Sequence, residues 1–238
     1  MMVIINLERK DRQLFSFRNI TEAIAACVIA HPIYLSQFIQ FIRNSSQYDV
    51  DRFHKTIARI QQRIQKKRCP ANSDDEYVKL LGGLSRACKK SDDVNDLRGI
   101  LAEQIFFQCF NRLSLGRDWT IRMGCSVKIN GEIVFCRLGD ESKITVDLAA
   151  WCFNRQVGKF YEVKVSPYAF KEVDCAYLSL LYSRLANAGL TDYKIGIFSL
   201  DDPILFLERI RSQGIVLHDE IAVLSIRDFI DDSYCGIL

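Results

Sequence analysis

The feature that most constrains the fold is an alternation of helix-like and strand-like segments that begins near Ser91. A long amphipathic helix opens it, with acids in its first turn and an apolar face for a core. Two strand-like runs flank Asn130-Gly131, the strongest short hairpin signal. Two further strands are expected at 144–153 and 159–166, followed by helix, strand, helix and strand. This order predicts an α/β core with a mixed sheet.

The two central strands each carry an acid, in the stretch "KITVDLAAWCFNRQVGKFYEVKVSP". Asp147 lies in the first strand, whereas Glu162 and Lys164 share one face of the second. Burial of an acid between apolar neighbours costs several kcal/mol unless a partner neutralises it. Two kinds of partner are open: a divalent cation, or an ion pair with Lys164 or with Arg98 of the preceding helix.

A magnesium ion suits the oxygen atoms in this region. Mg²⁺ prefers carboxylate and carbonyl oxygens and keeps several waters. The oxygens that meet this description belong to Glu103, Asp147, Glu162 and the Val163 carbonyl. A lysine beside such a metal, here Lys164, orients or deprotonates an attacking water and counters the charge of a phosphorane-like transition state.

The expected turn between the two strands conflicts with this site. If "NRQVG" forms a five-residue loop, Phe153 pairs with Lys159 and Asp147 falls opposite Val165. Asp147 would then point to the other face of the sheet from Glu162. A β-bulge or a different turn register is needed to bring the two acids together.

Charge divides the chain into two parts. Residues 1–90 carry 16 Lys and Arg against 8 Asp and Glu, and residues 91–238 carry 16 against 21. Lys66–Glu76, "KKRCPANSDDE", contains helix breakers and a change of charge sign, which are typical of a linker. We therefore expect a basic helical lobe at 1–90 and an α/β domain at 91–238.

One expected helix of the basic lobe, "DVDRFHKTIARIQQRIQKKR", has two faces. Apolar residues recur at helical spacing on one of them, and basic residues recur on another. The basic face is either an ordinary solvated surface or a surface that follows nucleic-acid phosphates. Its residues are Arg52, Lys55, Arg59, Arg63 and Lys66.

The cysteines and the N-terminus favour a cytoplasmic protein. Nine cysteines, an odd number, are scattered without metal-ligand spacing, which is typical of reduced thiols. The start of the chain lacks an export signal, and its longest apolar run ends at His31-Pro32, too short to span a membrane.

At the acidic strands the sequence resembles the PD-(D/E)XK superfamily, the restriction-endonuclease-like nucleases. The family's helical glutamate, strand aspartate and (D/E)-x-K motif correspond to Glu103 in "LRGILAEQ", Asp147 in "TVDLAAW", and Glu162 and Lys164 in "YEVKVSP". The resemblance covers about Asp92 to Leu200, and Val146 stands where the family has proline.

The resemblance implies a restriction-endonuclease-like α/β/α core and hydrolysis of nucleic-acid phosphodiesters, DNA more than RNA. It implies one or two Mg²⁺ or Mn²⁺ ions on Glu103, Asp147, Glu162 and the Val163 carbonyl, with Lys164 assisting the water. It further implies a role in restriction, phage defence or repair, as a homodimer or beside a helicase or ATPase subunit. Arg98 either contacts a phosphate at the rim or pairs with Asp93 or Asp96 of its own helix.

Two other functions remain open at this point. The chain is a non-catalytic nucleic-acid- or protein-binding subunit if Asp147, Glu162 and Lys164 form a structural ion network. It is a sensor if a partner bound to the N-terminal helices holds a nuclease inactive.

Overall fold

The computed structural model describes residues 2–9, 15–66, 72–111, 118–226 and 228. The chain forms two compact units, residues 13–108 and residues 1–12 together with 109–238. These bounds differ from the expected division near residue 90. The difference arises because the N-terminal residues form a strand of the sheet, and because most of the helix Ser91–Asn111 belongs to the helical unit.

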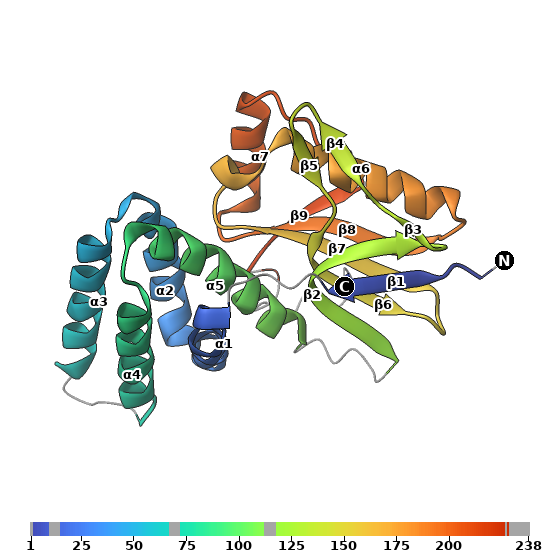
Figure 1. Ribbon diagram of the computed structural model, residues 1–238. Helices are drawn as coiled ribbons and strands as arrows, with labels where there is room; N and C mark the ends of the chain where they lie inside the picture. The colour runs from blue at the N-terminus through green and yellow to red at the C-terminus, as the bar shows by residue number, and fades with distance from the viewer. Residues whose placement is uncertain (1, 10–14, 67–71, 112–117, 227, 229–238) are drawn as a thin grey trace. The chain divides into compact units, whose positions relative to one another are not determined.

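The first unit is helical (Figure 1). Helix α1 packs against α2 and α4, and α4 also packs against α3. The rings of Tyr34 and Tyr77 stack with their centroids 4.4 Å apart, and both side chains are buried. The elements are α1 (Phe15–Ala30), α2 (Pro32–Asn44), the 3-10 helix η1 (Ser45–Gln47), α3 (Val50–Gln65), α4 (Asn72–Ala87) and α5 (Ser91–Asn111), whose last residues belong to the second unit.

Helix α4 corrects the expected linker. The helix begins at Asn72, so the second half of Lys66–Glu76 is helical. Asp74 and Asp75 lie in its first turn, where they suit the positive end of the helix dipole. Residues 67–71 lie outside the described part of the chain.

The second unit is an α/β domain with a mixed seven-stranded sheet (Figure 1). The strand order is β1-β2-β6-β7-β8-β9, with β3 paired to β2; β7, β8 and β9 run parallel, and the other pairs are antiparallel. The main strands are β1 (Ile5–Arg9), β2 (Trp119–Ile129), β3 (Glu132–Ile133), β6 (Val146–Cys152), β7 (Val157–Lys164), β8 (Asp192–Ser199) and β9 (Ile221–Ser225).

The crossover helices and a separate hairpin complete this unit. A two-stranded hairpin, β4 (Cys136–Leu138) and β5 (Glu141–Lys143), stands apart from the main sheet and contacts α6. The 3-10 helix η2 (Pro167–Ala169) and α6 (Glu172–Asn187) connect β7 to β8, and α7 (Pro203–Ser212) connects β8 to β9.

The core of the α/β domain lies between the sheet and its crossover helices. Phe160 of β7 and Ile197 of β8 share a buried cluster with Leu181 of α6 and Phe206 of α7. On the other face, Tyr161 contacts Phe110 near the end of α5, with ring centroids 5.8 Å apart. Since side chains alternate along a strand, Glu162 lies on the same face as Phe160, toward α6.

The Asn130-Gly131 hairpin is confirmed, but its second strand is only two residues long. Both turn residues have positive φ, 52° and 90°, as this type of hairpin turn requires. The chain then leaves the sheet to form β4 and β5. Strand β6 pairs with β2 from Trp119 to Cys125, and β1 pairs with β2 from Cys125 to Ile129. The described residues include no helix long and apolar enough to cross a membrane.

Candidate functional site

The turn between β6 and β7 is tighter than the sequence suggested, and this brings the two acids to one face. Cys152 pairs with Val157, and the register continues to Leu148 opposite Tyr161. The next pair in this register is Asp147, which precedes Leu148, and Glu162, which follows Tyr161. Opposite residues of an antiparallel pair point to the same face, so the expected conflict of register does not arise.

The strands separate just beyond this register, and Asp147 occupies the gap. Its Oδ2 atom accepts a hydrogen bond from the Val163 main-chain N–H at 2.8 Å, and its side chain is buried. Across the sheet on β2, Gly124 lies between the residues that pair with Leu148 and Val146, and its φ of 54° is in the left-handed region. Both neighbouring strands thus depart from regular pairing at Asp147.

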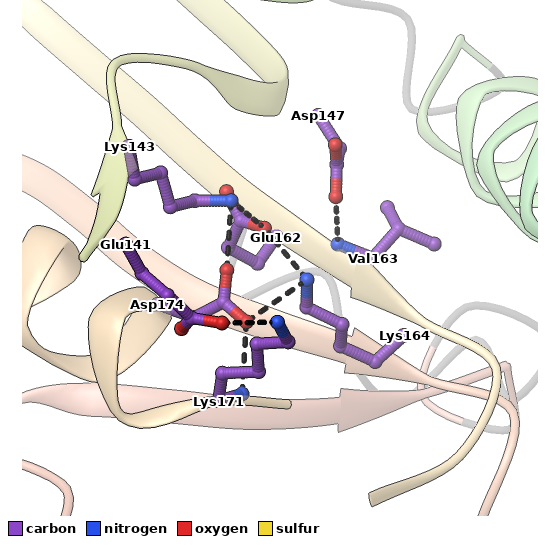
Figure 2. Close-up of polar contacts among 8 residues, drawn as sticks. All are labelled: Glu141, Lys143, Asp147, Glu162, Val163, Lys164, Lys171 and Asp174. Carbon is purple, nitrogen blue, oxygen red and sulfur yellow. Dashed lines mark hydrogen bonds and ion pairs between the residues drawn. The ribbon is translucent and has the colours of Figure 1, made fainter. Parts of the chain in front are cut away.

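Glu162 is the most buried member of the site, with no exposed surface. Two ammonium groups contact its Oε2 atom, Lys143 Nζ at 2.9 Å and Lys164 Nζ at 3.3 Å (Figure 2). Its Oε1 atom is buried and has no hydrogen-bond partner among the described residues. A fully buried carboxylate with one unsatisfied oxygen is energetically costly, and such an oxygen fits a ligand that is not part of the chain.

Asp174, in the first turn of α6, completes a charge cluster with Lys143, Glu162 and Lys164 (Figure 2). Its Oδ1 lies 2.8 Å from Lys143 Nζ, and its Oδ2 lies 3.2 Å from Lys164 Nζ. The Oδ2 atom also accepts a hydrogen bond from the Lys171 N–H at 2.9 Å, which fixes the carboxylate at the start of the helix. Each acid of the charge cluster therefore contacts both lysines.

The electrostatics of the charge cluster reflect burial and close opposite charges. Burial raises the pKa of Glu162 to about 8, with a further contribution from Asp147, while Lys164 and Lys143 oppose this rise. Burial would lower the pKa of Lys164 and of Lys143, but neighbouring carboxylates, Glu162 first, hold both above the ordinary value. Burial would raise the pKa of Asp174, but Lys164 and Lys143 outweigh it and lower this pKa below its ordinary value.

The sequence interpretation missed two members of the charge cluster, Lys143 and Asp174. Lys143 ends the β4–β5 hairpin, whose approach to β7 depends on tertiary contacts that no local pattern reveals. Asp174 had a weak signal, since an acid three residues after a helix N-cap is typical of a capping box. Outside the charge cluster, Lys171 forms an ion pair with Glu141 of β5, and both side chains are largely exposed.

Three of the four expected metal ligands belong to the α/β domain, and the fourth, Glu103, belongs to the helical unit. Asp147, Glu162 and the Val163 main chain adjoin one another. Glu103 is half-buried on the part of α5 that belongs to the helical unit. No group of three or more His, Cys, Asp or Glu side chains that could hold a metal ion is found in the described ranges. The metal stays a prediction, and so does the part that Glu103 would take in binding it.

The basic face of α3 has the geometry that its sequence predicted. Phe53, Ile57, Ile60 and Ile64 are buried. The five basic side chains are exposed, and four of them line a surface hollow of about 500 Å³: Arg52, Lys55, Arg59 and Arg63. The guanidinium of Arg52 also lies 4.6 Å from the centre of the Tyr48 ring in this hollow.

Arg98 has a structural contact in the helical unit. Its Nε donates a hydrogen bond of 2.9 Å to the carbonyl oxygen of Ile42, in the last turn of α2. A basic side chain suits this position because the last carbonyls of a helix lack partners within it. Asp93 instead accepts hydrogen bonds from the main-chain N–H groups of Lys89 and Lys90. A phosphate contact by Arg98 stays a prediction.

Comparison with known proteins gives little further information. No protein-family model matches the chain, and no curated protein matches it. Among solved structures, the fold is similar to a crystal structure of protein VC1899 from Vibrio cholerae, with a TM-score of 0.44 and 12% sequence identity. The similarity covers 95% of this chain and 56% of that one, so the chain spans little more than half the length of this structural neighbour.

Proposed function

We propose that the protein is a metal-dependent nuclease of restriction-endonuclease-like fold that hydrolyses phosphodiester bonds, with DNA as the favoured substrate. The observation that carries the proposal is the position of Asp147 and Glu162 on one face of the sheet, with Lys164 beside them. They lie toward the carboxyl end of β7, where β7 pairs with the parallel strand β8. In α/β sheets, ligands commonly bind beyond the carboxyl ends of such strands.

The donor set supports a hard dication. Two buried carboxylates and a main-chain carbonyl are the ligand types that Mg²⁺ and Mn²⁺ take, and Mg²⁺ is often held by one or two carboxylates and several waters. Asp147, Glu162 and the Val163 carbonyl would hold the ion, with the unsatisfied Glu162 Oε1 as one donor. When bound, the metal would supply Lewis-acid chemistry and lower the pKa of a coordinated water.

The chain's own groups would position and neutralise the substrate. Lys164 would place an ammonium charge where negative charge develops during phosphodiester hydrolysis, because an ammonium in a site with little water interacts strongly with such charge. Asp174 would hold this amine through its 3.2 Å contact. The exposed basic face of α3 would grip the phosphate backbone of the substrate through Arg52, Lys55, Arg59, Arg63 and Lys66.

Cleavage assays on supercoiled plasmid and on single-stranded RNA, in Mg²⁺, Mn²⁺ or EDTA, test this function. We expect cutting that requires metal, and a loss of at least about 100-fold in Asp147→Asn, Glu162→Gln and Lys164→Met, because each removes a charge at the reacting centre. Lys128→Met is the matched control, since this lysine pairs with Glu8 at a partly exposed position on β2. Cutting rates are compared only among variants that thermal unfolding shows to be folded.

A second function is favoured by the contacts of Glu162 with two lysines. Such an alternating cluster of acids and amines satisfies its own charges, as in a non-catalytic nucleic-acid- or protein-binding subunit. In that case wild-type protein cuts neither nucleic acid in any metal, and Glu162→Gln lowers the free energy of unfolding by about 3–5 kcal/mol without other consequence. Absence of metal-dependent cutting would therefore overturn the nuclease.

A further inference from the structure

Lys143 has the same contacts as Lys164, although it comes from a different element. Its Nζ lies 2.9 Å from Glu162 Oε2 and 2.8 Å from Asp174 Oδ1. The corresponding distances for Lys164 are 3.3 and 3.2 Å. Lys143 is thus at least as well placed as the lysine of the motif, and it is held by the same two acids.

The β4–β5 hairpin delivers this second lysine to the site. Lys143 is the last residue of β5, and the hairpin lies outside the main sheet but against α6. An ion pair between Glu141 and Lys171 connects the hairpin to the residue that precedes α6 (Figure 2). The hairpin is therefore anchored on the same helix whose first turn supplies Asp174.

The two amines are the members of the charge cluster that face solvent. The side chains of Lys143 and Lys164 are each 14% exposed, whereas Glu162 is 0% and Asp174 is 6% exposed. The two lysine side chains are therefore the more accessible members of the charge cluster. This order of exposure is expected where lysines contact a ligand and is not required of a purely internal ion network.

The formal charges of the site also match a phosphodiester once a dication is present. With Glu162 ionised, as a bound dication requires, Asp147, Glu162, Asp174 and the two lysines carry a formal net charge of minus one. A dication on the acids changes this to plus one. A single phosphodiester, with one negative charge, then neutralises the site.

We propose that Lys143 is a second phosphate-binding lysine of the site, which receives the substrate phosphate together with Lys164, and that Asp174 positions both amines. This inference rests on the proposed function, since it deepens the same site. It assigns the β4–β5 hairpin a direct role in substrate binding. The two lysines would bind one phosphate from two elements, which fixes its position better than either alone.

Two binding measurements on the full chain separate this role from a structural one. Mn²⁺ binding is measured by titration calorimetry, and binding of a fluorescein-labelled DNA oligonucleotide by anisotropy, with Ca²⁺ present to limit turnover. In Lys143→Met we expect oligonucleotide binding to weaken by about tenfold, as for loss of one charge-assisted contact. Mn²⁺ binding should be unchanged or tighter, because Glu162 loses a competing cation. Lys143→Arg should retain oligonucleotide binding.

Lys128→Met is the matched control, because its amine pairs with Glu8 outside the charge cluster and its hairpin, and it should change neither affinity. Oligonucleotide binding at the wild-type level in Lys143→Met would overturn the inference, and if wild-type protein still cuts DNA the nuclease stands. If Lys143→Met loses affinity tenfold but the wild-type protein never cuts DNA, Lys143 remains a phosphate ligand and the nuclease is overturned. If Lys143→Met unfolds, equal loss of both affinities in Lys143→Gln and Lys143→Arg would identify a structural role.

Discussion

Lys159 occupies the other end of β7 from the charge cluster, and its amine forms no ion pair with an acid in the described part of the chain. It is buried, and its Nζ lies 5.5 Å from the centre of the Trp119 ring and 6.0 Å from that of Phe110. Its pKa is lowered to about 8, first by burial and then by Lys194 and Arg155, while Asp192 on β8 opposes the shift. Contacts with aromatic rings offset part of the cost of burying the charge.

This lysine should make the stability of the sheet depend on pH. Between about pH 8 and the ordinary pKa of 10.5, the unfolded chain holds a proton that the folded chain has released. The unfolded state binds more protons there, so the free energy of unfolding should rise with pH across this window. Lys159→Met should remove that rise and add about 1–3 kcal/mol of stability at pH 7.

Urea unfolding of wild-type and variant protein at pH 7 and pH 10 measures both effects. Lys79→Met is the control, because Lys79 is exposed on α4 and its replacement should leave the pH dependence as in wild type. A Lys159→Met variant that is less stable than wild type at pH 7 would mean that the aromatic contacts outweigh burial.

At the residue scale, the sequence predicted the site residues on β6 and β7 but not those that reach the site from other elements. Asp147, Glu162 and Lys164 were identifiable because strand alternation and the E-x-K spacing are local properties. Lys143 and Asp174 were missed, since a hairpin and a helix start bring them to Glu162 through tertiary contacts. The neutralising partner of Glu162 was expected to be a metal, Lys164 or Arg98, and the structure adds Lys143 to Lys164.

At the scale of elements, the β6–β7 connection decides whether the acids meet. The expected five-residue loop was wrong, because pairing continues to Cys152 and Val157. The chain turns instead through Phe153–Gln156, where Gln156 adopts a φ of 55°. Sequence reasoning did not find this turn, since a non-glycine residue in the left-handed region is uncommon. The observed register is shifted by three residues from the expected one. An odd shift reverses which side chains of the two strands share a face of the sheet.

Helix α3 was predicted well because its apolar and basic residues recur with strong helical periodicity. The role of its basic face in DNA binding can be tested by charge reversal. Arg59→Glu with Arg63→Glu should weaken DNA binding and reduce its salt dependence, because each lost phosphate contact lowers the slope of log K against log salt by about 0.9. Lys79→Glu with Arg86→Glu makes the same charge change on exposed positions of α4. Anisotropy titrations at several salt concentrations measure both.

The comparison between the two double variants determines what the basic face does. An equal loss of affinity in both would indicate a general effect of net charge on the helical unit. An unchanged salt slope in the α3 variant would return this face to ordinary solvated surface. Binding that depends on α3 alone would support its role as the phosphate grip of the proposed nuclease.

At the scale of the whole molecule, the α/β domain is assembled from both ends of the described chain. Strand β1 pairs with β2 from Ile5–Ile129 to Arg9–Cys125, so the helical unit is an insertion between β1 and the rest of the domain. The charge asymmetry that suggested a boundary near residue 90 is a property of surface residues, whereas the division depends on strand pairing. A five-residue strand before a helical region has too weak a pattern to reveal its distant partner.

The insertion predicts that substitutions near the N-terminus destabilise the distant sheet. Ile5 is 6% exposed and belongs to the core of the α/β domain, whereas the adjacent Ile4 is 51% exposed. Ile5→Ala should lower the free energy of unfolding by about 2–4 kcal/mol, and Ile4→Ala by less than about 0.5 kcal/mol. The chain's two tryptophans, Trp119 and Trp151, lie on β2 and β6, so their fluorescence reports unfolding of this domain.

Urea titrations followed by tryptophan fluorescence therefore test the division directly. A domain that began near residue 90 would unfold at the same urea concentration in wild type and in Ile5→Ala. A domain completed by β1 should unfold at lower urea in Ile5→Ala and at the wild-type concentration in Ile4→Ala. The same destabilisation should reach the candidate site, because β1 supports β2, and β2 pairs with the strand that carries Asp147.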